Sequence, residues 1–250
     1  PNMATSDKMI GSSAAWAAGY TGAGSRIAII DTGADVDHPS LDPDALKYAL
    51  QGSNATIMTE ADLTDEVLNQ LNAYTRKAGL TAADFYVNEK IPFGFNYVDA
   101  DTDITHDNDT QGDHGSHVTG IAAGNRFVKD EAGNYVAALD SVMTQGVAPD
   151  AQILTMKVFG KGGGAYDSDY MVAIEDAMVL GADAANLSLG GSFPGYSEYT
   201  EEKYRHILDE IVGSGMVVTI SAGNSGSWFD QTAFGLPYAC LLYTSPSPRD

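Results

Sequence analysis

The sequence predicts an α/β protein with three layers: a doubly wound, mainly parallel sheet with helices on both of its faces. Four short runs are rich in β-branched and long aliphatic residues, as is typical of strands buried on both faces: residues 26–30, 152–159, 184–189 and 216–221. Helical patterns separate the last three runs, as expected of parallel strands joined by crossover helices. We expect one domain, because 250 residues can bury one substantial core.

Two segments with helical spacing lie between the last three predicted strands. The first begins at Asp167 or Ser168, which we expect to cap it, and stops at Gly181. The second covers residues 197–212, is charged on one side and apolar on the other, and ends at the glycines of residues 213–215. Both have an apolar face that a sheet can cover.

Residues 43–90 form a polar, helix-rich insertion that follows the first strand. Within it we expect a helix capped by Thr59 or Asp62. Its apolar stripe is expected to face the core and consists of Leu63, Val67, Leu68 and Leu71.

The formal net charge is −21, from 34 acidic and 13 basic residues. A surface of this sign repels phosphate backbones, so we expect no nucleic-acid partner. The charge suits cation binding or a secreted surface. No run approaches the roughly 18 apolar residues of a membrane span, so none is expected in this segment.

The last eleven residues, "CLLYTSPSPRD", match codon for codon the translation of a transposon adapter used in sequencing libraries. We therefore expect residues 240–250, which include the single cysteine Cys240, to be non-native read-through. We expect only residues 1–239 to belong to the protein itself.

Asp31 stands at the end of the first predicted strand, directly before a Thr32–Gly33 turn. In open parallel sheets, ligands and catalytic groups collect at the carboxyl ends of strands. A buried carboxylate there needs a partner. An aspartate that merely caps the following turn explains the position equally well.

The stretch "GDHGSHVTG", residues 112–120, holds two histidines, His114 and His117. Zinc peptidases with two histidines on a helix need four-residue spacing and an intervening glutamate, and both are missing here. Metal binding by this pair is therefore disfavoured. The glycine after His114 leaves room for another chain segment to approach the imidazole.

Five motifs occur in the order in which subtilisin-like serine peptidases carry their signatures, and the chain resembles that family over nearly all of residues 10–230. The long span between Asp31 and His114 looks more like the cell-envelope branch, with the lactocepins and C5a-peptidase-like enzymes. The motifs are "IAIIDTGADVDHP" (27–39), "DHGSHVTGIAAG" (113–124), "GVAPDAQILTMKVF" (146–159), "AANLSLGG" (184–191) and "VVTISAGNSG" (217–226).

The resemblance implies a role for each of several residues. Asp31 would orient and support the general base His114, and His117 would face the interior as a packing residue. Asn224 would donate its side-chain amide to the developing oxyanion. Without the resemblance, Asn224 reads as a turn residue beside Gly223.

Two further segments resemble the family's substrate cleft. Ser188, Leu189 and Gly190 match the wall of the pocket for the side chain before the scissile bond. Gly162, Gly163 and Gly164 match the edge along which a peptide substrate lies as an added strand, where glycines let its backbone approach.

The acidic loop of residues 98–113 raises the question of calcium, with Asp99, Asp101 and Asp103 as candidate ligands. The loop lacks the glycine and terminal glutamate of an EF-hand, and a solvated acidic loop is the alternative. The chemistry implied by the resemblance needs no cofactor.

The family's triad also needs a serine in a Gly-Thr-Ser motif downstream of the asparagine segment, and residues 1–250 contain no such motif. We expect the chain to be the incomplete, inactive amino-terminal part of a secreted or cell-envelope bacterial serine endopeptidase, a monomer that acts on proteins or peptides. The alternative is a non-catalytic surface or binding module with the same fold. A dinucleotide-binding protein is disfavoured, because "GYTGAG" (19–24) precedes its strand instead of following one.

Overall fold

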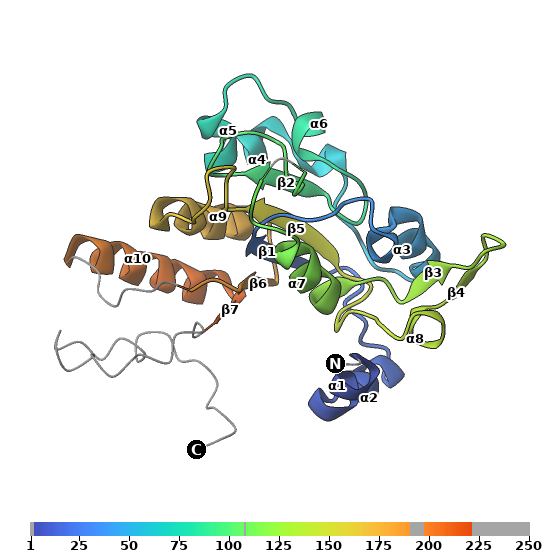
Figure 1. Cartoon of the computed structure of the whole chain (residues 1–250). Coiled ribbons are helices and arrows are strands. Elements are labelled where there is room, and N and C mark those ends of the chain that lie inside the picture. The colour runs from blue at the N-terminus through green and yellow to red at the C-terminus, as the bar shows by residue number, and fades with distance from the viewer. Residues whose placement is uncertain (1–2, 108, 191–197, 222–250) are drawn as a thin grey trace, which may run out of the picture.

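The computed structural model describes residues 3–107, 109–190 and 198–221. A five-stranded parallel sheet forms the centre of the molecule, with the strand order β2-β5-β1-β6-β7 (Figure 1). The strands are β1 (Arg26–Asp31), β2 (Phe93–Asn96), β5 (Gln152–Lys157), β6 (Ala184–Leu187) and β7 (Val217–Ile220). The four strands expected from the sequence are therefore confirmed. The expectation missed β2, an edge strand whose sequence, Phe-Gly-Phe-Asn, contains no β-branched or aliphatic residue.

Helices cover both faces of this sheet, which confirms the three-layer prediction. Because successive side chains of a strand point to opposite faces, β1 contributes to two separate cores. Ala28 and Ile30 pack with helices α9 (Asp167–Val179) and α10 (Glu198–Ser214). Ile29 packs on the other face with α7 (His114–Ala123). Figure 1 shows α7 and the α9–α10 pair on either side of the strands.

The α7 side of the sheet is less fully covered at β7. Val218 and Ile220 pack toward the α9–α10 core, so Val217 and Thr219 face the other way. Val217 is 62% exposed and Thr219 is also exposed. Among the described elements, the third layer thus lies mainly over β1 and β5.

The helix boundaries differ slightly from the expected ones. The N-cap of α9 is Tyr166, so Asp167 is its first helical residue and not its cap. The predicted stop at Gly181 is confirmed, because that residue has the left-handed φ of +66° that ends helices. Helix α10 continues through Gly213 to Ser214 and ends before Gly215, whose φ is +78°.

The insertion of residues 43–90 contains short helical turns where a longer helix was expected. Thr59 caps the short turn of residues 60–62 through a capping box with Asp62. Of the two proposed caps, Thr59 therefore has this role. Thr64 then accepts a hydrogen bond from Val67 N and starts a new turn. The apolar stripe is buried as predicted, since Leu68 and Leu71 are 4% and 0% exposed. The helical segments are α3 (Pro43–Ala49), η2 (Glu60–Asp62), α4 (Asp65–Leu68), α5 (Asn72–Arg76) and α6 (Ala82–Phe85).

The buried carboxylate of Asp176 helps to join this insertion to the body of the domain. Asp176 of α9 accepts hydrogen bonds from Asn72 N at 2.7 Å and Ala73 N at 2.9 Å, at the start of α5. The Tyr97 hydroxyl donates to the same carboxylate at 2.9 Å. Burial raises the pKa of Asp176, although these donors act in the opposite direction. The contact fixes the insertion against α9.

The remaining elements lie at the amino terminus and around a small hairpin. Trp16 Nε1 donates to Val147 O at 2.8 Å and ties the amino-terminal helices to the domain. None of the helices in the described ranges is long and apolar enough to cross a membrane. These elements are α1 (Met3–Ile10), α2 (Ser12–Ala17), η1 (Pro39–Leu41), α8 (Ala138–Ser141) and the antiparallel pair β3 (Phe127–Lys129) and β4 (Tyr135–Ala137).

Candidate active site

Asp31 and His114, which are far apart in the sequence, meet at the carboxyl end of β1. Asp31 is the last residue of that strand, and its side chain is 1% exposed. His114 is the first residue of α7, and its Nδ1 lies 2.7 Å from Asp31 Oδ1. Because an ionised carboxylate only accepts hydrogen bonds, Nδ1 carries the proton in this contact. The imidazole is therefore held in one tautomer by a buried negative charge.

The other ring nitrogen of His114 remains available for chemistry. The histidine side chain is 52% exposed, whereas its carboxylate partner is buried. With Nδ1 protonated, Nε2 of the neutral ring has a free lone pair that can take a proton from a bound group. The negative charge of Asp31 then stabilises the imidazolium that forms. The geometry is that of a general base with its orienting acid.

The turn after β1 holds this pair in place. Thr32 N donates to Asp31 Oδ1 at 2.7 Å, and Thr32 Oγ1 accepts from Gly115 N at 2.8 Å. One residue thus contacts both the strand that carries the acid and the helix that carries the base. The chain passes closely here, because a Cβ at Gly115 would overlap the carbonyl oxygen of Gly33. The room expected after His114 is used by this turn.

Gly33 has its own reason to lack a side chain. Its φ is +109°, and a Cβ at this position would overlap the carbonyl oxygen of Ile104. Ala34 N donates to that same oxygen at 2.8 Å. The Asp-Thr-Gly sequence therefore produces a tight turn that the acidic loop can approach.

Sequence reasoning missed the buried ion pair beneath this turn. Lys157, the last residue of β5, contacts Asp109 and also donates from Nζ to Thr32 O at 2.6 Å. The side chains of Lys157 and Asp109 are 2% and 1% exposed. One signal was present: a lysine that ends a strand whose other residues are all uncharged needs a charged partner if the strand is buried.

The predicted substrate residues lie after the carboxyl ends of strands that flank β1. Ser188, Leu189 and Gly190 follow β6 directly, and Asn186 Nδ2 lies 3.0 Å from Ser188 Oγ. Gly162, Gly163 and Gly164 follow β5, and the last two have φ values of +81° and +83°. Both segments thus follow strands that are neighbours of the strand carrying Asp31, while their substrate contacts stay a prediction. Asn224 lies outside the described residues.

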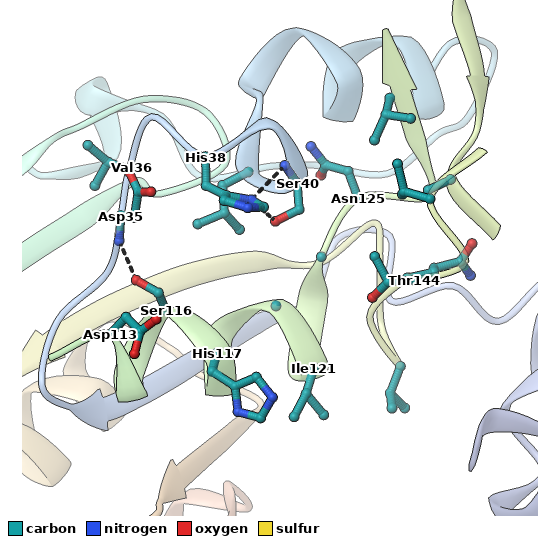
Figure 2. A pocket seen from close by; sticks show the side chains of 18 of the residues that line it. Asp35, Val36, His38, Ser40, Asp113, Ser116, His117, Ile121, Asn125 and Thr144 are labelled. Atoms are coloured by element: carbon teal, nitrogen blue, oxygen red, sulfur yellow. Dashed lines mark hydrogen bonds between the residues drawn. The ribbon is translucent and has the colours of Figure 1, made fainter. Parts of the chain in front are cut away.

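The prediction that His117 faces the interior is wrong. His117 is exposed, and Figure 2 shows it standing out from α7 beside Ile121. Both line a cavity of about 1010 Å³ on this side of α7. Ser116, one residue earlier, accepts from Asp35 N at 2.6 Å and thereby joins α7 to the loop after β1 (Figure 2). The two histidines of α7 therefore have different surroundings: His114 contacts Asp31, and His117 lines this cavity.

The carboxylates proposed for calcium are engaged with neighbouring donors. Asp99 Oδ2 accepts from Lys161 N at 3.0 Å, Asp101 Oδ1 accepts from Asp103 N at 3.1 Å, and Asp103 Oδ1 accepts from Thr105 Oγ1 at 2.7 Å. In the part of the chain that the structure describes, no three His, Cys, Asp or Glu side chains converge to hold a metal ion. Calcium binding by this loop stays a prediction.

The parallel sheet and the Asp31–His114 pair define an α/β protein with an acid–base site at the carboxyl ends of its strands. Comparison with known proteins then identifies the family. A family model described as the subtilase family, peptidase S8, matches residues 22–240. The chain belongs to the subtilase family, which confirms the resemblance seen in its motifs.

Several bacterial peptidases are similar to most of this chain. The PI-type proteinase of Lactococcus lactis subsp. cremoris is 33% identical over 91% of the chain, and minor extracellular protease Vpr of Bacillus subtilis (strain 168) is 31% identical over 90%. A C5a peptidase of Streptococcus pyogenes is 28% identical over 86%. The chain spans only 11%, 21% and 16% of the length of these three relatives.

Proposed function

We propose that the protein is a serine endopeptidase in which His114 is the general base and Asp31 its orienting acid. The observation that carries this proposal is the 2.7 Å contact between His114 Nδ1 and Asp31 Oδ1, with the acid buried and the base exposed. A buried aspartate that only capped its turn would not need an imidazole partner. Membership of the subtilase family supports the same reaction.

In the proposed reaction, a serine hydroxyl attacks the carbonyl carbon of a peptide bond. His114 Nε2 takes the hydroxyl proton and delivers it to the leaving amine, which leaves an acyl-enzyme. In a second proton transfer of the same kind, His114 takes a proton from the water that attacks the acyl-enzyme and returns it to the serine, while Asp31 stays ionised and holds the tautomer. Asn224 would donate its amide to the oxyanion, as the family motif implies. The Thr32 contacts keep the acid and base aligned through both proton transfers.

We infer that the substrate is a protein or peptide bound between two glycine-containing segments. Residues 162–164 would pair with the peptide backbone as an added strand, and residues 188–190 would line the pocket for the side chain before the scissile bond. The extracellular Vpr relative and the strongly acidic composition support a secreted or cell-envelope location. We also propose that the protein is a monomer and that the acidic loop of residues 98–113 binds calcium.

We also propose that the chain of residues 1–250 does not hydrolyse peptide bonds by itself. The reaction needs a nucleophilic serine, and the sequence contains no Gly-Thr-Ser motif. The acid–base half of the site can still be tested in this chain, because Asp31 and His114 are both present.

A fluorophosphonate probe, which labels activated serines, tests the proposal directly. Protein made from the complete source reading frame should be labelled and should cleave casein, whereas the chain of 250 residues should do neither. His114→Ala should abolish both signals. Asp31→Asn should reduce turnover by about 10⁴-fold, the loss this change causes in a trypsin-like enzyme. His117→Ala is the matched control, and it should retain activity because His117 is exposed and the Asp31 carboxylate is paired with His114 instead.

The non-catalytic alternative predicts a different pattern. A complete protein that folds, yet resists the probe and leaves casein intact, would be a binding module with a subtilase fold. Equal labelling of the His114→Ala and unmodified proteins would exclude His114 as the base.

A further inference from the structure

Lys157 occupies a place where a charged side chain needs a specific reason. All six residues of β5 are buried, and Lys157 is the only charged residue among them. Its ammonium is enclosed with the Asp109 carboxylate, and both side chains are almost fully buried. A buried ion pair is weak evidence for stability, because the desolvation of two charges offsets their attraction. Its position in the fold points to another use.

Lys157 lies directly beside Asp31 in the sheet. Asp31 and Lys157 are register partners at the carboxyl ends of β1 and β5, and Val158 N donates to Asp31 O at 2.9 Å. The lysine side chain runs beneath the following turn, since a Cβ built on Gly33 would lie 3.3 Å from Lys157 Cδ. Its Nζ then reaches Thr32 O at 2.6 Å.

Thr32 is the residue through which this contact reaches the catalytic pair. Its N–H donates to Asp31 Oδ1, its Oγ1 accepts from Gly115 N, and its carbonyl accepts from Lys157. With three of its polar groups fixed by three segments, Thr32 has one orientation. Without the lysine, its carbonyl would be a buried acceptor lacking that partner.

Asp109 extends the same connection to the loop that leads into α7. Its Oδ2 contacts Lys157, and its Oδ1 accepts from Gln111 N at 2.9 Å. His114 follows only a few residues later in the chain. The ammonium therefore joins the turn after Asp31 to the segment that precedes His114.

We propose that Lys157 and Asp109 are positioning residues that hold Asp31 and His114 at hydrogen-bonding distance. This inference rests on the proposed peptidase function only for its effect on turnover. The alignment itself is a property of residues 31–157 and is open to measurement in the present chain.

The test uses NMR of the chain labelled with ¹⁵N-histidine. The Nδ1 proton of His114, held by Asp31, gives a downfield resonance that is slow to exchange with water. The chain has five histidines, so His114→Gln assigns the signal. Three proteins are compared with the unmodified chain: Lys157→Met, the double variant Lys157→Met with Asp109→Leu, and Lys129→Met. The last is the control, because Lys129 pairs with Asp42 at 3.0 Å on the surface.

The double variant separates alignment from stability. Lys157→Met alone leaves the Asp109 carboxylate buried and unpaired, and it can fail to fold for that reason. Replacing both residues with apolar ones removes the unpaired charge and should restore the denaturant midpoint. The double variant still lacks the hydrogen bond from Lys157 Nζ to Thr32 O. Its His114 Nδ1 proton resonance should therefore be lost, or the proton should exchange with water at least about tenfold faster. Lys129→Met should leave it unchanged.

Each other result overturns the proposal. A double variant with an unchanged His114 resonance would show that the pair has no positioning role. One that does not fold would show that the pair serves the folding of the domain.

Turnover by the complete protein gives an independent reading. The double variant should lower kcat by about 10- to 100-fold, as expected for a misplaced catalytic group, with KM changed less than about twofold. If the complete protein has no activity while the NMR result holds, the peptidase proposal fails and the positioning proposal stands. If it is active and kcat is unchanged in the double variant, the positioning proposal fails.

Discussion

The closest backbone approach in the site gives the sharpest test of this geometry. Gly115 lies in the first turn of α7 against the turn of Thr32 and Gly33. A Cβ at position 115 would overlap Gly33 O and would come within 2.9 Å of Gly33 N and 3.1 Å of Thr32 Oγ1. The first two atoms belong to backbone, so a side-chain rotation cannot relieve the overlap. In Gly115→Ala, the start of α7 would have to move by about 1 Å.

Three effects set the expected change in the free energy of unfolding of Gly115→Ala. Alanine is better than glycine in a helix by about 1 kcal/mol. Overpacking costs about 1–3 kcal/mol, and weakening the buried Gly115 N to Thr32 Oγ1 hydrogen bond costs about 1–3 kcal/mol. We therefore expect Gly115→Ala to lower the free energy of unfolding by about 3 kcal/mol. His114 should move with the helix, so its contact with Asp31 should lengthen.

Gly120 provides a matched control in the same helix. A Cβ there would meet no atom within 4 Å, and its φ is not positive. Gly120→Ala should therefore raise the free energy of unfolding by up to about 1 kcal/mol. Urea unfolding followed by circular dichroism measures both variants. The reasoning would be refuted if Gly115→Ala were as stable as Gly120→Ala, or if it kept the exchange-protected His114 resonance.

Substitutions at three further residues test other contacts in the structure. Burial lowers the pKa of Lys90 to about 7, so the unfolded chain keeps its proton at pH values where the folded chain has lost it. Between about pH 7 and pH 10, the free energy of unfolding should rise with pH by up to about 1.4 kcal/mol per unit relative to Lys90→Met, measured by urea unfolding across that range. Asp176→Ala leaves the α5 amides and the Tyr97 hydroxyl without their acceptor and should cost about 3 kcal/mol in the same assay, with Asp176→Asn costing less. Thr32→Val removes the acceptor of Gly115 N, and it should cost about 1–2 kcal/mol in urea unfolding and speed hydrogen exchange at that amide.

Each of these three predictions would be contradicted by a specific result. Parallel pH curves for the Lys90→Met and unmodified chains would mean that Lys90 stays charged inside the fold, held by its bonds to Pro149 O and Ala151 O. An Asp176→Ala variant as stable as the unmodified chain would mean that the other contacts of α5, such as the Arg76–Asp169 pair, hold it without this carboxylate. Unchanged exchange at Gly115 in Thr32→Val would mean that burial of this first-turn amide, and not its bond to Thr32, protects it from exchange.

Local patterns in the sequence were enough to predict most of the sheet. Strands β1, β5, β6 and β7 are apolar runs because parallel strands are buried on both faces, and such runs stand out from their surroundings. Gly181 was recognised as a helix end because its left-handed conformation is a property of one residue. Strand β2 was missed, since Phe-Gly-Phe-Asn lacks the β-branched and aliphatic residues that mark the other strands, and its pairing with β5 is a long-range contact.

The insertion shows how nearby side chains override a periodic pattern. The apolar stripe of residues 63–71 has helical spacing and is buried, as expected. Thr59 and Thr64 nevertheless bond to the backbone of the following residues and start separate turns. His117 was misplaced for a related reason, because its position in a motif does not determine what lies against the outer face of α7.

The sequence by itself determined the parallel α/β fold, the family and the two residues of the acid–base pair, because each depends on a local pattern or on an ordered set of motifs. Only the tertiary structure decided how that pair is held. Lys157 bonds to Thr32 across 125 residues and to Asp109 across 48, and Gly115 bonds to Thr32 across 83. Such contacts arise when strands and helices pack, and a buried charge then takes whichever partner the fold brings within reach.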